Sequence, residues 1–481
     1  MALAFPKTNA TVLAPLGAVG VYWAWFGLSP KRAFLVGWAA GSVFFAINYS
    51  WFGETAGALI APFGFFLTLG PAIGDAAFAF ALPACAIALI RDRTSPALLP
   101  LASAAVFAFA EWFRCEGLGQ LGVPFGSLGY TQVATPLAPL AADVGTYGIT
   151  FVLMLLAAYA AQAIRSHASP ASLRAFGIAA GCVVVALAAS WLTWPARNLA
   201  APAIPVAAVQ GNIAQSLKFT DASIRAGITR YAALTEGLRG RHPRIVLWPE
   251  TVIVKALNKE PALQARFANL ARALNAELVV GTFEVTATEV YNTLFFFRPD
   301  GTLDAVYRKR QLVPFAEHLP FKAFLSWIPW ASQVSNLGIG DTDGVIEAGG
   351  FRVAPIVCWE SAFSGLVSGD VRDGATLLLI ATDDAWFGKT AGPYQHAQIA
   401  QMRALETGRW VLRAASTGVS GIIAPNGRYV AQTQLEETAV LNGNVGRPVD
   451  TFYDAFGPAP LALVFALVFG AIAFAGRSRP F

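Results

Sequence analysis

The stretch Phe351–Glu360, FRVAPIVCWE, decides how we interpret the fold of the second half of this chain. Val353, Ile356 and Val357 have the apolar, β-branched character of a strand that is buried in a sheet. The run ends at Cys358, which an aromatic and an acidic residue follow. A strand that ends at such a change of polarity can present a nucleophile to a cleft, and Cys358 is the candidate. The alternative is a small core residue, because buried cysteines are common and usually inert.

Residues 203–446 have the composition of a globular α/β domain. Runs of strand character alternate there with amphipathic runs of helical period, and this alternation predicts a layered α/β fold. We expect strands at 204–209, 244–248, 278–283, 292–297, 352–357, 376–381 and 410–415, and helices at 223–239, 261–276 and 394–409. Glycine-rich turns after residue 418 predict hairpins.

The overall composition is that of a membrane protein. Hydrophobic residues make up 56% of the 481 residues and charged residues only 13%, which excludes an ordinary soluble enzyme. Apolar runs long enough to cross a bilayer lie at 11–28, 33–52, 68–90, 97–113, 142–164, 175–194 and 459–476. We therefore predict an α-helical multi-pass membrane bundle in residues 1–195, with about six spans, and a C-terminal transmembrane helix at 459–476.

Short loops rich in Lys and Arg set the predicted orientation, because such loops stay on the cytoplasmic side. They lie at Lys31-Arg32, Arg91–Arg93, Arg165–Arg174 and Arg477–Arg479. An even number of crossings between successive loops places residues 195–458 on the outer face. We attribute the formal net charge of +5 to this topology. The chain has no basic stripe interleaved with aromatic residues, so nucleic acid is not an expected partner.

Metals, cofactors and disulfides are not predicted. The four cysteines, Cys85, Cys115, Cys182 and Cys358, have no CxxC or CxxH spacing, so they indicate neither a zinc site nor a disulfide framework. A formal GxGxxG match at 117–122 follows a membrane span instead of a strand, and we reject it as a dinucleotide site.

Two further strand-like stretches carry a chemically functional side chain at their end. They are RIVLWPE at 244–250, which ends at Glu250, and YRKRQLVPF at 307–315, which contains Lys309. A thiol needs a base to become a thiolate, and a carboxylate in a desolvated pocket has enough proton affinity to serve. A fixed ammonium favours the thiolate and stabilises charge on an attacked carbonyl oxygen. Glu250, Lys309 and Cys358 are therefore the candidate catalytic residues, although each alone has a structural explanation as a helix cap, an ion-pair partner or a core residue.

These stretches resemble the Glu-Lys-Cys pattern of the nitrilase superfamily, and in particular the apolipoprotein N-acyltransferase family, in which this domain is fused to membrane spans. The resemblance rests on WPE at 248–250, YRKRQLVPFAEHLP at 307–320, CWES at 358–361, DDAWFG at 383–388, VQGNIAQSLKF at 209–219, YNT at 291–293 and GPYQHAQIAQMRALETGRWVLRAASTG at 392–418. It implies a nitrilase-like αββα sandwich for residues 203–446, on the periplasmic side of a bacterial inner membrane.

The resemblance also implies the role of each candidate. Glu250 is then the general base and acid, Lys309 the stabiliser of the oxyanion and transition state, and Cys358 the nucleophile.

Three further positions match supporting residues of the family: Glu317 near the lysine, Glu360 after the nucleophile, and Trp386 on a loop beside the pocket. The alternative is that Glu317 and Glu360 hold loops by hydrogen bonds and that Trp386 only packs. Cys-His catalysis through His318 or His396 is a mechanistic alternative. We interpret His396, which lies among apolar residues of a predicted helix, as a packed or hydrogen-bonded core histidine.

The implied reaction is a ping-pong acyl transfer. Cys358 attacks an ester of a membrane phospholipid and leaves a lysophospholipid and a thioacyl enzyme. The α-amino group of a diacylglyceryl-cysteine at the N-terminus of a lipoprotein then takes the acyl chain. One alternative is a membrane-tethered amidase or nitrile hydrolase that uses the same triad with water as acceptor. Another is a non-catalytic transporter or lipid-binding protein.

The segment His318–Trp330, HLPFKAFLSWIPW, is too apolar for an ordinary exposed loop. It is expected to dip into the membrane interface and guide acyl chains, with Trp327 and Trp330 at the level of the headgroups. Packing against the membrane spans is the alternative.

Overall fold

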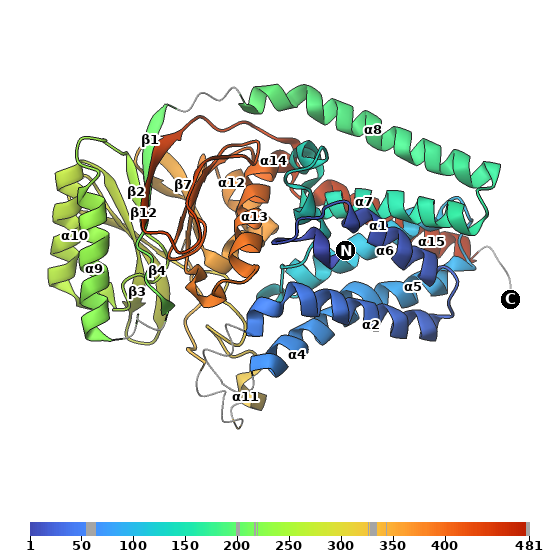
Figure 1. Cartoon of the computed structure of the whole chain (residues 1–481), viewed down its shortest axis with the longest axis horizontal. Coiled ribbons are helices and arrows are strands. Elements are labelled where there is room, and N and C mark those ends of the chain that lie inside the picture. The colour runs from blue at the N-terminus through green and yellow to red at the C-terminus, as the bar shows by residue number, and fades with distance from the viewer. Residues whose placement is uncertain are drawn as a thin grey trace. The chain divides into compact units, whose positions relative to one another are not determined.

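The computed structural model describes residues 1–53, 64–198, 203–215, 218, 220–325, 327, 334–342 and 344–477. The chain forms two compact units, coloured by sequence in Figure 1. One unit consists of Met1–Pro195 together with Thr451–Phe481, and the other is Ala196–Asp450. In sequence, the second unit is therefore inserted into the first.

The first unit is built from helices. They are α1 (Leu13–Trp25), α2 (Pro30–Asn48), α4 (Gly64–Ala76), the π-helical turn η2 (Ala77–Ala81), α5 (Leu82–Arg91), α6 (Leu99–Trp112), α7 (Ala141–Arg165), α8 (Pro170–Asn198), α14 (Phe452–Phe456) and α15 (Ala459–Arg477). Among the described residues, three helices are long and apolar enough to cross a membrane: Leu69–Arg91, Ala138–Arg165 and Pro170–Thr193. The predicted α-helical membrane bundle is confirmed, while its orientation and number of spans stay predictions.

A buried arginine organises the irregular segment that follows α6. Arg114 lies in the π-helical turn η3 (Phe113–Gly117) and is only 1% exposed. Its guanidinium donates to the Phe125 carbonyl at 3.0 Å and to the Tyr49 hydroxyl at 3.1 Å, and it pairs with Asp75 at 3.1 Å. A charge buried among apolar helices is tolerated only when it is paired and hydrogen-bonded. Arg114 therefore ties this segment to α4 and to the end of α2.

The second unit contains two six-stranded sheets. The first has the order β12-β1-β2-β3-β4-β5, and the second has the order β11-β10-β9-β8-β7-β6. The strands are β1 (Ile204–Gln210), β2 (Ile245–Leu247), β3 (Glu277–Val285), β4 (Val290–Phe297), β5 (Leu303–Arg308), β6 (Ile346–Ala348), β7 (Phe351–Val357), β8 (Leu377–Thr382), β9 (Trp410–Ala415), β10 (Gly421–Ile423), β11 (Tyr429–Gln432) and β12 (Ala439–Val445). The central strands of each sheet, β1-β2-β3 and β7-β8-β9, are parallel.

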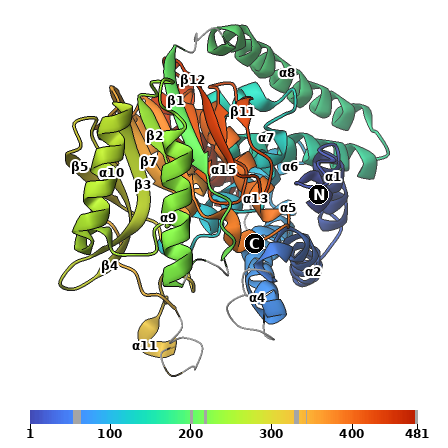
Figure 2. The same ribbon diagram turned by 60° about the vertical axis from the view of Figure 1, so that its left-hand side comes forward.

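Alternating side chains sort these strands into layers. In β1, Val206 and Ala208 pack in a core shared by both sheets, whereas Ala207 and Val209 pack against helices, as the two-residue period of a strand requires. Helices α9 (Asp221–Glu236) and α10 (Pro261–Leu274) cover the first sheet, as Figures 1 and 2 show, and α12 (Ser364–Arg372) and α13 (Gly392–Thr407) cover the second. This is the predicted αββα sandwich.

Gly281 in β3 allows the turn after β2 to approach the sheet closely. A Cβ at this position would lie 2.0 Å from the carbonyl oxygen of Pro249 and 2.7 Å from the Cα of Glu250. Both neighbours are backbone atoms, which cannot move aside as a flexible side chain can. The position of Glu250 therefore depends on a glycine in the adjacent strand.

We expect Gly281→Ala to destabilise the second unit by about 1–3 kcal/mol, the usual cost of overpacking a well-packed site. Gly369→Ala in α12 is the matched control, since an added Cβ there meets nothing closer than an Arg372 guanidinium nitrogen at 3.9 Å. The control is expected to stabilise slightly, because alanine favours helices over glycine. Thermal unfolding of both variants in detergent tests this, and equal unfolding temperatures would contradict it.

We expect the free energy of unfolding to depend on pH because of Glu277, at the start of β3. Glu277 is 3% exposed, and its Oε2 accepts a long hydrogen bond from the Gly349 N–H, at 3.4 Å. Burial raises the pKa of Glu277 to about 7. The folded state therefore binds this proton more tightly than the unfolded state, and stability falls as pH rises from about 4.5 to about 7.

Glu277→Gln should remove this loss of stability. We expect wild type and variant to unfold at similar temperatures at pH 5, where the carboxyl is protonated, and the variant to unfold several degrees higher at pH 8. Thermal unfolding at the two pH values measures the difference. A gain that is the same at both would show that ionisation of Glu277 is not its cause.

Candidate active site

Cys358 stands at a sharp turn directly after β7. Its backbone φ is +51°, in the left-handed region that non-glycine residues avoid, and its side chain is buried at 8% exposure. Such a conformation costs of order 1 kcal/mol or more and persists only when surrounding contacts impose it. Backbone strain of this kind is concentrated at functional sites, which makes an inert core cysteine the poorer interpretation.

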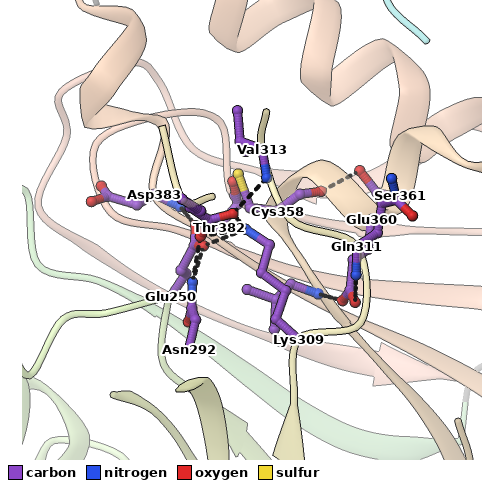
Figure 3. A network of polar contacts seen from close by, with 12 residues as sticks. Glu250, Asn292, Lys309, Gln311, Val313, Cys358, Glu360, Ser361, Thr382 and Asp383 are labelled. Carbon is purple, nitrogen blue, oxygen red and sulfur yellow. Dashed lines mark hydrogen bonds and ion pairs between the residues drawn. The ribbon is translucent and has the colours of Figure 1, made fainter. Parts of the chain in front are cut away.

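Glu250 follows β2 and has both carboxylate oxygens bound. Oε1 accepts hydrogen bonds from Asn292 Nδ2 at 2.8 Å and from Lys309 Nζ at 3.1 Å. Oε2 accepts from the backbone N–H of Asp383 at 2.8 Å, so a residue from the second sheet fixes a carboxylate that the first sheet carries. Figure 3 shows this group of side chains around Cys358.

Lys309 follows β5 and is 1% exposed. Its Nζ lies 3.1 Å from Glu250 Oε1 and 2.8 Å from Glu317 Oε2, so one buried ammonium bridges two carboxylates. Burial alone would lower the pKa of Lys309, but the charges of Glu250, Glu317 and Cys358 raise it well above its usual range. The neighbouring negative charges therefore favour the charged form of Lys309.

Asn292 in β4 is a component of the site that the sequence did not single out. Its Nδ2 donates to Glu250 Oε1 at 2.8 Å and to Glu317 Oε1 at 3.0 Å. The amide thus adds a second bridge between two like charges. It lies within the YNT motif at 291–293, so the signal was present, but nothing in the sequence indicates its partners.

Glu360 receives hydrogen bonds from two separate segments. Its Oε1 accepts from the Tyr307 hydroxyl at 2.9 Å and from the backbone N–H groups of Arg310 at 2.6 Å and Gln311 at 3.2 Å. Its Oε2 accepts from the backbone N–H of Val357 at 2.6 Å.

These contacts place Glu360 between the backbone beside Lys309 and the backbone beside Cys358. The carboxylate therefore fixes the segment that carries Lys309 relative to the turn that carries Cys358. Burial raises the pKa of Glu360 to about 6, and the backbone donors oppose that rise. In this geometry Glu360 holds loops by hydrogen bonds.

The surroundings of the Cys358 thiol act on its pKa in opposite directions. Burial raises the pKa of Cys358 well above its usual range, the charge of Glu250 raises it further, and Lys309 and a hydrogen bond with Thr382 lower it. The site thus holds a thiol with a carboxylate and an ammonium close enough to act on it electrostatically. This arrangement suits a nucleophile that loses its proton only as it attacks.

Two further predictions from the sequence concern Trp386 and the apolar segment that begins at His318. Trp386 lies on the short 3-10 turn η11 (Asp384–Phe387) after β8 and is half-buried, and its role beside the pocket stays a prediction. In the apolar segment from His318, the side chains of Phe324 and Trp327 are 76% and 79% exposed. Trp330 lies outside the described residues.

Comparisons with known proteins agree with this architecture. A family model for carbon-nitrogen hydrolases matches residues 205–448, and a model for the apolipoprotein N-acyltransferase N-terminal domain matches residues 1–159. An apolipoprotein N-acyltransferase of Pseudomonas syringae pv. tomato is 33% identical over 485 residues, which cover 96% of this chain and 93% of that protein. This chain belongs to the apolipoprotein N-acyltransferase family.

Other members of the family give a similar result. The apolipoprotein N-acyltransferase of Pseudomonas putida is 32% identical, with 99% of this chain and 94% of that protein covered. That of Nitrosomonas europaea is 34% identical over 79% of this chain and 74% of that protein. The match extends over the helical unit as well as the sandwich, so the apolipoprotein N-acyltransferase family describes the whole chain and not only its carbon-nitrogen hydrolase part.

A second buried polar network in this acyltransferase contacts the turn that carries Cys358. Asp383 and Asp384 follow β8, and Asp383 forms an ion pair with Lys218. Asp384 pairs with Arg413 of β9 at 2.9 Å and with His396 of α13 at 2.9 Å. His396 is fully buried and hydrogen-bonded, as the sequence predicts, but its location beside the candidate site does not follow from the sequence.

We expect Glu360→Gln to be more damaging than Tyr307→Phe. The glutamine amide would place N–H donors against backbone donors, whereas the phenylalanine removes a single hydroxyl. The expected losses of stability are about 1–3 kcal/mol and about 1 kcal/mol respectively. Acyl transfer by Glu360→Gln should fall at least tenfold, because a misplacement of about 1 Å near reacting groups can cost that much or more. Equal effects of the two variants would argue against a positioning role for Glu360.

Proposed function

We propose that this protein transfers an acyl chain from a membrane phospholipid, through a thioester on Cys358, to the N-terminal amino group of a diacylglyceryl-cysteine lipoprotein. The observation that carries the proposal is the bridge of Lys309 between Glu250 and Glu317 beside a strained, buried cysteine. Membership of the apolipoprotein N-acyltransferase family supports the choice of substrates, and the amidase alternative has no comparable support.

The first half-reaction forms the thioester. Glu250 takes the thiol proton of Cys358 as Sγ attacks the carbonyl carbon of a phospholipid ester. The C–S bond forms, and the negative charge that develops on the carbonyl oxygen is stabilised by the Lys309 ammonium. When the C–O bond to the glycerol breaks, the leaving oxygen takes the proton from Glu250, and a lysophospholipid departs.

In the second half-reaction the Cys358 sulfur is the leaving group, and an amine is the nucleophile. The neutral α-amino group of the lipoprotein attacks the thioester carbonyl, and Glu250 accepts a proton from the nitrogen. The C–S bond breaks as the amide forms, and the Cys358 sulfur regains a proton from Glu250. Lys309 stabilises the oxyanion in both steps, because each passes through a tetrahedral intermediate at the same carbon.

We further propose that the second unit faces the periplasm and that the helical unit lies in the inner membrane of a bacterium. The Lys- and Arg-rich short loops support this orientation through the positive-inside rule. Both proposed substrates are anchored in lipid. An enzyme that is tethered on either side of its catalytic unit, by α8 before β1 and by α15 after β12, meets them without leaving the membrane.

The test is acyl transfer from a phospholipid with a labelled acyl chain to a diacylglyceryl-cysteine peptide, followed by mass analysis of the peptide. Cys358→Ala should give no product. Glu250→Gln and Lys309→Met should reduce the rate at least about a hundredfold, the usual effect of removing a general base or an oxyanion donor.

Lys255→Met is the matched control for Lys309→Met, because the Lys255 side chain forms a partly exposed ion pair with Glu260 at 3.2 Å. Its transfer rate should equal that of wild type. Thermal unfolding of each variant shows whether a loss of activity reflects loss of folding. Product formation by folded Cys358→Ala would overturn the proposal.

A further inference from the structure

Lys218 is a buried cation in a stretch of sequence that the proposed mechanism does not use. It lies in VQGNIAQSLKF at 209–219, which contains the end of β1 and the residues that follow it. The Lys218 side chain is 3% exposed, and its Nζ forms an ion pair at 2.5 Å with Asp383 Oδ2, whose side chain is 2% exposed. Lysine and aspartate are almost never fully buried unless they are paired. Each of these two charges therefore depends on the other to remain in the protein interior.

The Asp383 carboxylate is bound at both of its oxygens. Oδ2 forms the ion pair with Lys218. Oδ1 accepts hydrogen bonds from the Ser416 hydroxyl and, at 3.3 Å, from the backbone N–H of Ala385, so that Asp383 caps the turn η11. Because these contacts come from separate segments of the chain, they fix the backbone of Asp383 as well as its side chain.

The backbone N–H of Asp383 binds the proposed general base. It donates to Glu250 Oε2 at 2.8 Å, while Glu250 Oε1 accepts from Lys309 and Asn292. Figure 3 shows the Asp383 side chain pointing away from Glu250 while its backbone nitrogen faces that carboxylate. The Asp383 N–H therefore fixes the second oxygen of the base, and with it the rotation of the carboxylate.

Ser416 joins the segment that carries Lys218 to the strand end that carries Asp383. The Ser416 N–H donates to the Thr382 carbonyl at 3.1 Å, and the Ser416 carbonyl accepts from the Asn212 N–H at 3.0 Å. The segment after β1 is thus held at two points, at Asn212 against the end of β9 and at Lys218 against the end of β8. This attachment places the Lys218 ammonium beside Asp383.

We propose that Lys218 is a positioning residue for the acylation of Cys358. Its ion pair holds Asp383 in the conformation in which the Asp383 N–H binds Glu250. Lys218 thus acts on the base through Asp383. The inference rests on the proposed function, in which Glu250 takes the proton of the Cys358 thiol.

The ion pair also sets the balance of charge around the reacting groups. Three carboxylates, those of Glu250, Glu317 and Asp383, pair with the two ammonium groups of Lys309 and Lys218. Without Lys218, the charge of Asp383 would be uncompensated. Added negative charge opposes both the thiolate and the oxyanion of the tetrahedral intermediate. Loss of Lys218 is therefore expected to slow the chemical step.

Acyl-transfer kinetics of Lys218→Met, Asp383→Asn and the double variant test the proposal as a double-mutant cycle. Lys218→Met should lower kcat at least about tenfold, because a small displacement near reacting groups has that effect, while KM for the phospholipid changes less than about threefold. Asp383→Asn leaves the ammonium without its partner and should also be slow. The double variant removes both charges, and its kcat should return to within about threefold of wild type.

Thermal unfolding distinguishes positioning from a role in stability. A purely structural ion pair would lower the unfolding temperature of Lys218→Met and leave kcat of the folded protein unchanged, and this result overturns the proposal. Lys255→Met is the control for loss of a partly exposed ion pair and should keep the kcat of wild type.

The double variant decides the cause of any loss. If the uncompensated charge of Asp383 is the cause, removal of that charge restores both folding and transfer, even where Lys218→Met does not fold. A double variant that is as slow as Lys218→Met, or that does not fold, overturns the proposal.

A burst of nitrophenolate from p-nitrophenyl butyrate measures the acylation of Cys358 without either lipid substrate. Sγ attacks the ester carbonyl, Glu250 takes the thiol proton, the C–S bond forms, and nitrophenolate leaves as the C–O bond breaks. The burst rate of Lys218→Met should fall at least about tenfold, and the double variant should recover it.

The burst separates this proposal from the proposed function. A wild-type protein that gives the burst but no acylated lipoprotein peptide would refute the proposed function, while slow burst kinetics in Lys218→Met would still support the assignment of Lys218. Equal burst rates in wild type and Lys218→Met would overturn the assignment, whatever the outcome of the transfer assay.

Discussion

The active-site geometry depends on one buried ammonium held between two carboxylates. Lys309 lies 3.1 Å from Glu250 and 2.8 Å from Glu317, with its side chain almost entirely removed from solvent. Burying three charges is expensive, and removal of the Lys309 ammonium would leave two carboxylates without their shared cation in a low-dielectric site. The surrounding hydrogen bonds from Asn292 and the Asp383 backbone satisfy the remaining carboxylate oxygens. This group of charges is therefore a fixed electrostatic framework into which a reacting carbonyl can be placed without reorganisation.

The αββα sandwich explains why such a framework can be assembled from distant parts of the chain. Glu250 and Lys309 follow strands of the first sheet, and Cys358 and Asp383 follow strands of the second. The shared core between the sheets brings these strand ends together, and the Asp383 to Glu250 hydrogen bond crosses from one sheet to the other. Glu360 adds a further link, because it accepts from backbone groups on both the lysine and the cysteine segments.

Much of this fold could be predicted from the sequence because its main elements carry strong periodic signals. Strands expected at 352–357 and 410–415 correspond to β7 (Phe351–Val357) and β9 (Trp410–Ala415). The edge strand β6 has three residues and α12 contains two glycines, so neither has a pattern that sequence reasoning can detect. The three candidate residues were visible because each ends a strand-like run. The partners Asn292, Asp384 and His396 were not, since their contacts join residues far apart in sequence and depend on the completed packing.

The central claim is that Cys358 carries the acyl chain between two substrates. Intact-mass analysis of the purified protein after incubation with phospholipid tests it most directly. The account predicts a mass increase of one acyl chain that maps to Cys358, is removed by hydroxylamine, and is discharged by a diacylglyceryl-cysteine peptide with formation of the acylated peptide. An enzyme that transfers the chain while never showing this adduct, or that carries it on another residue, would contradict the account.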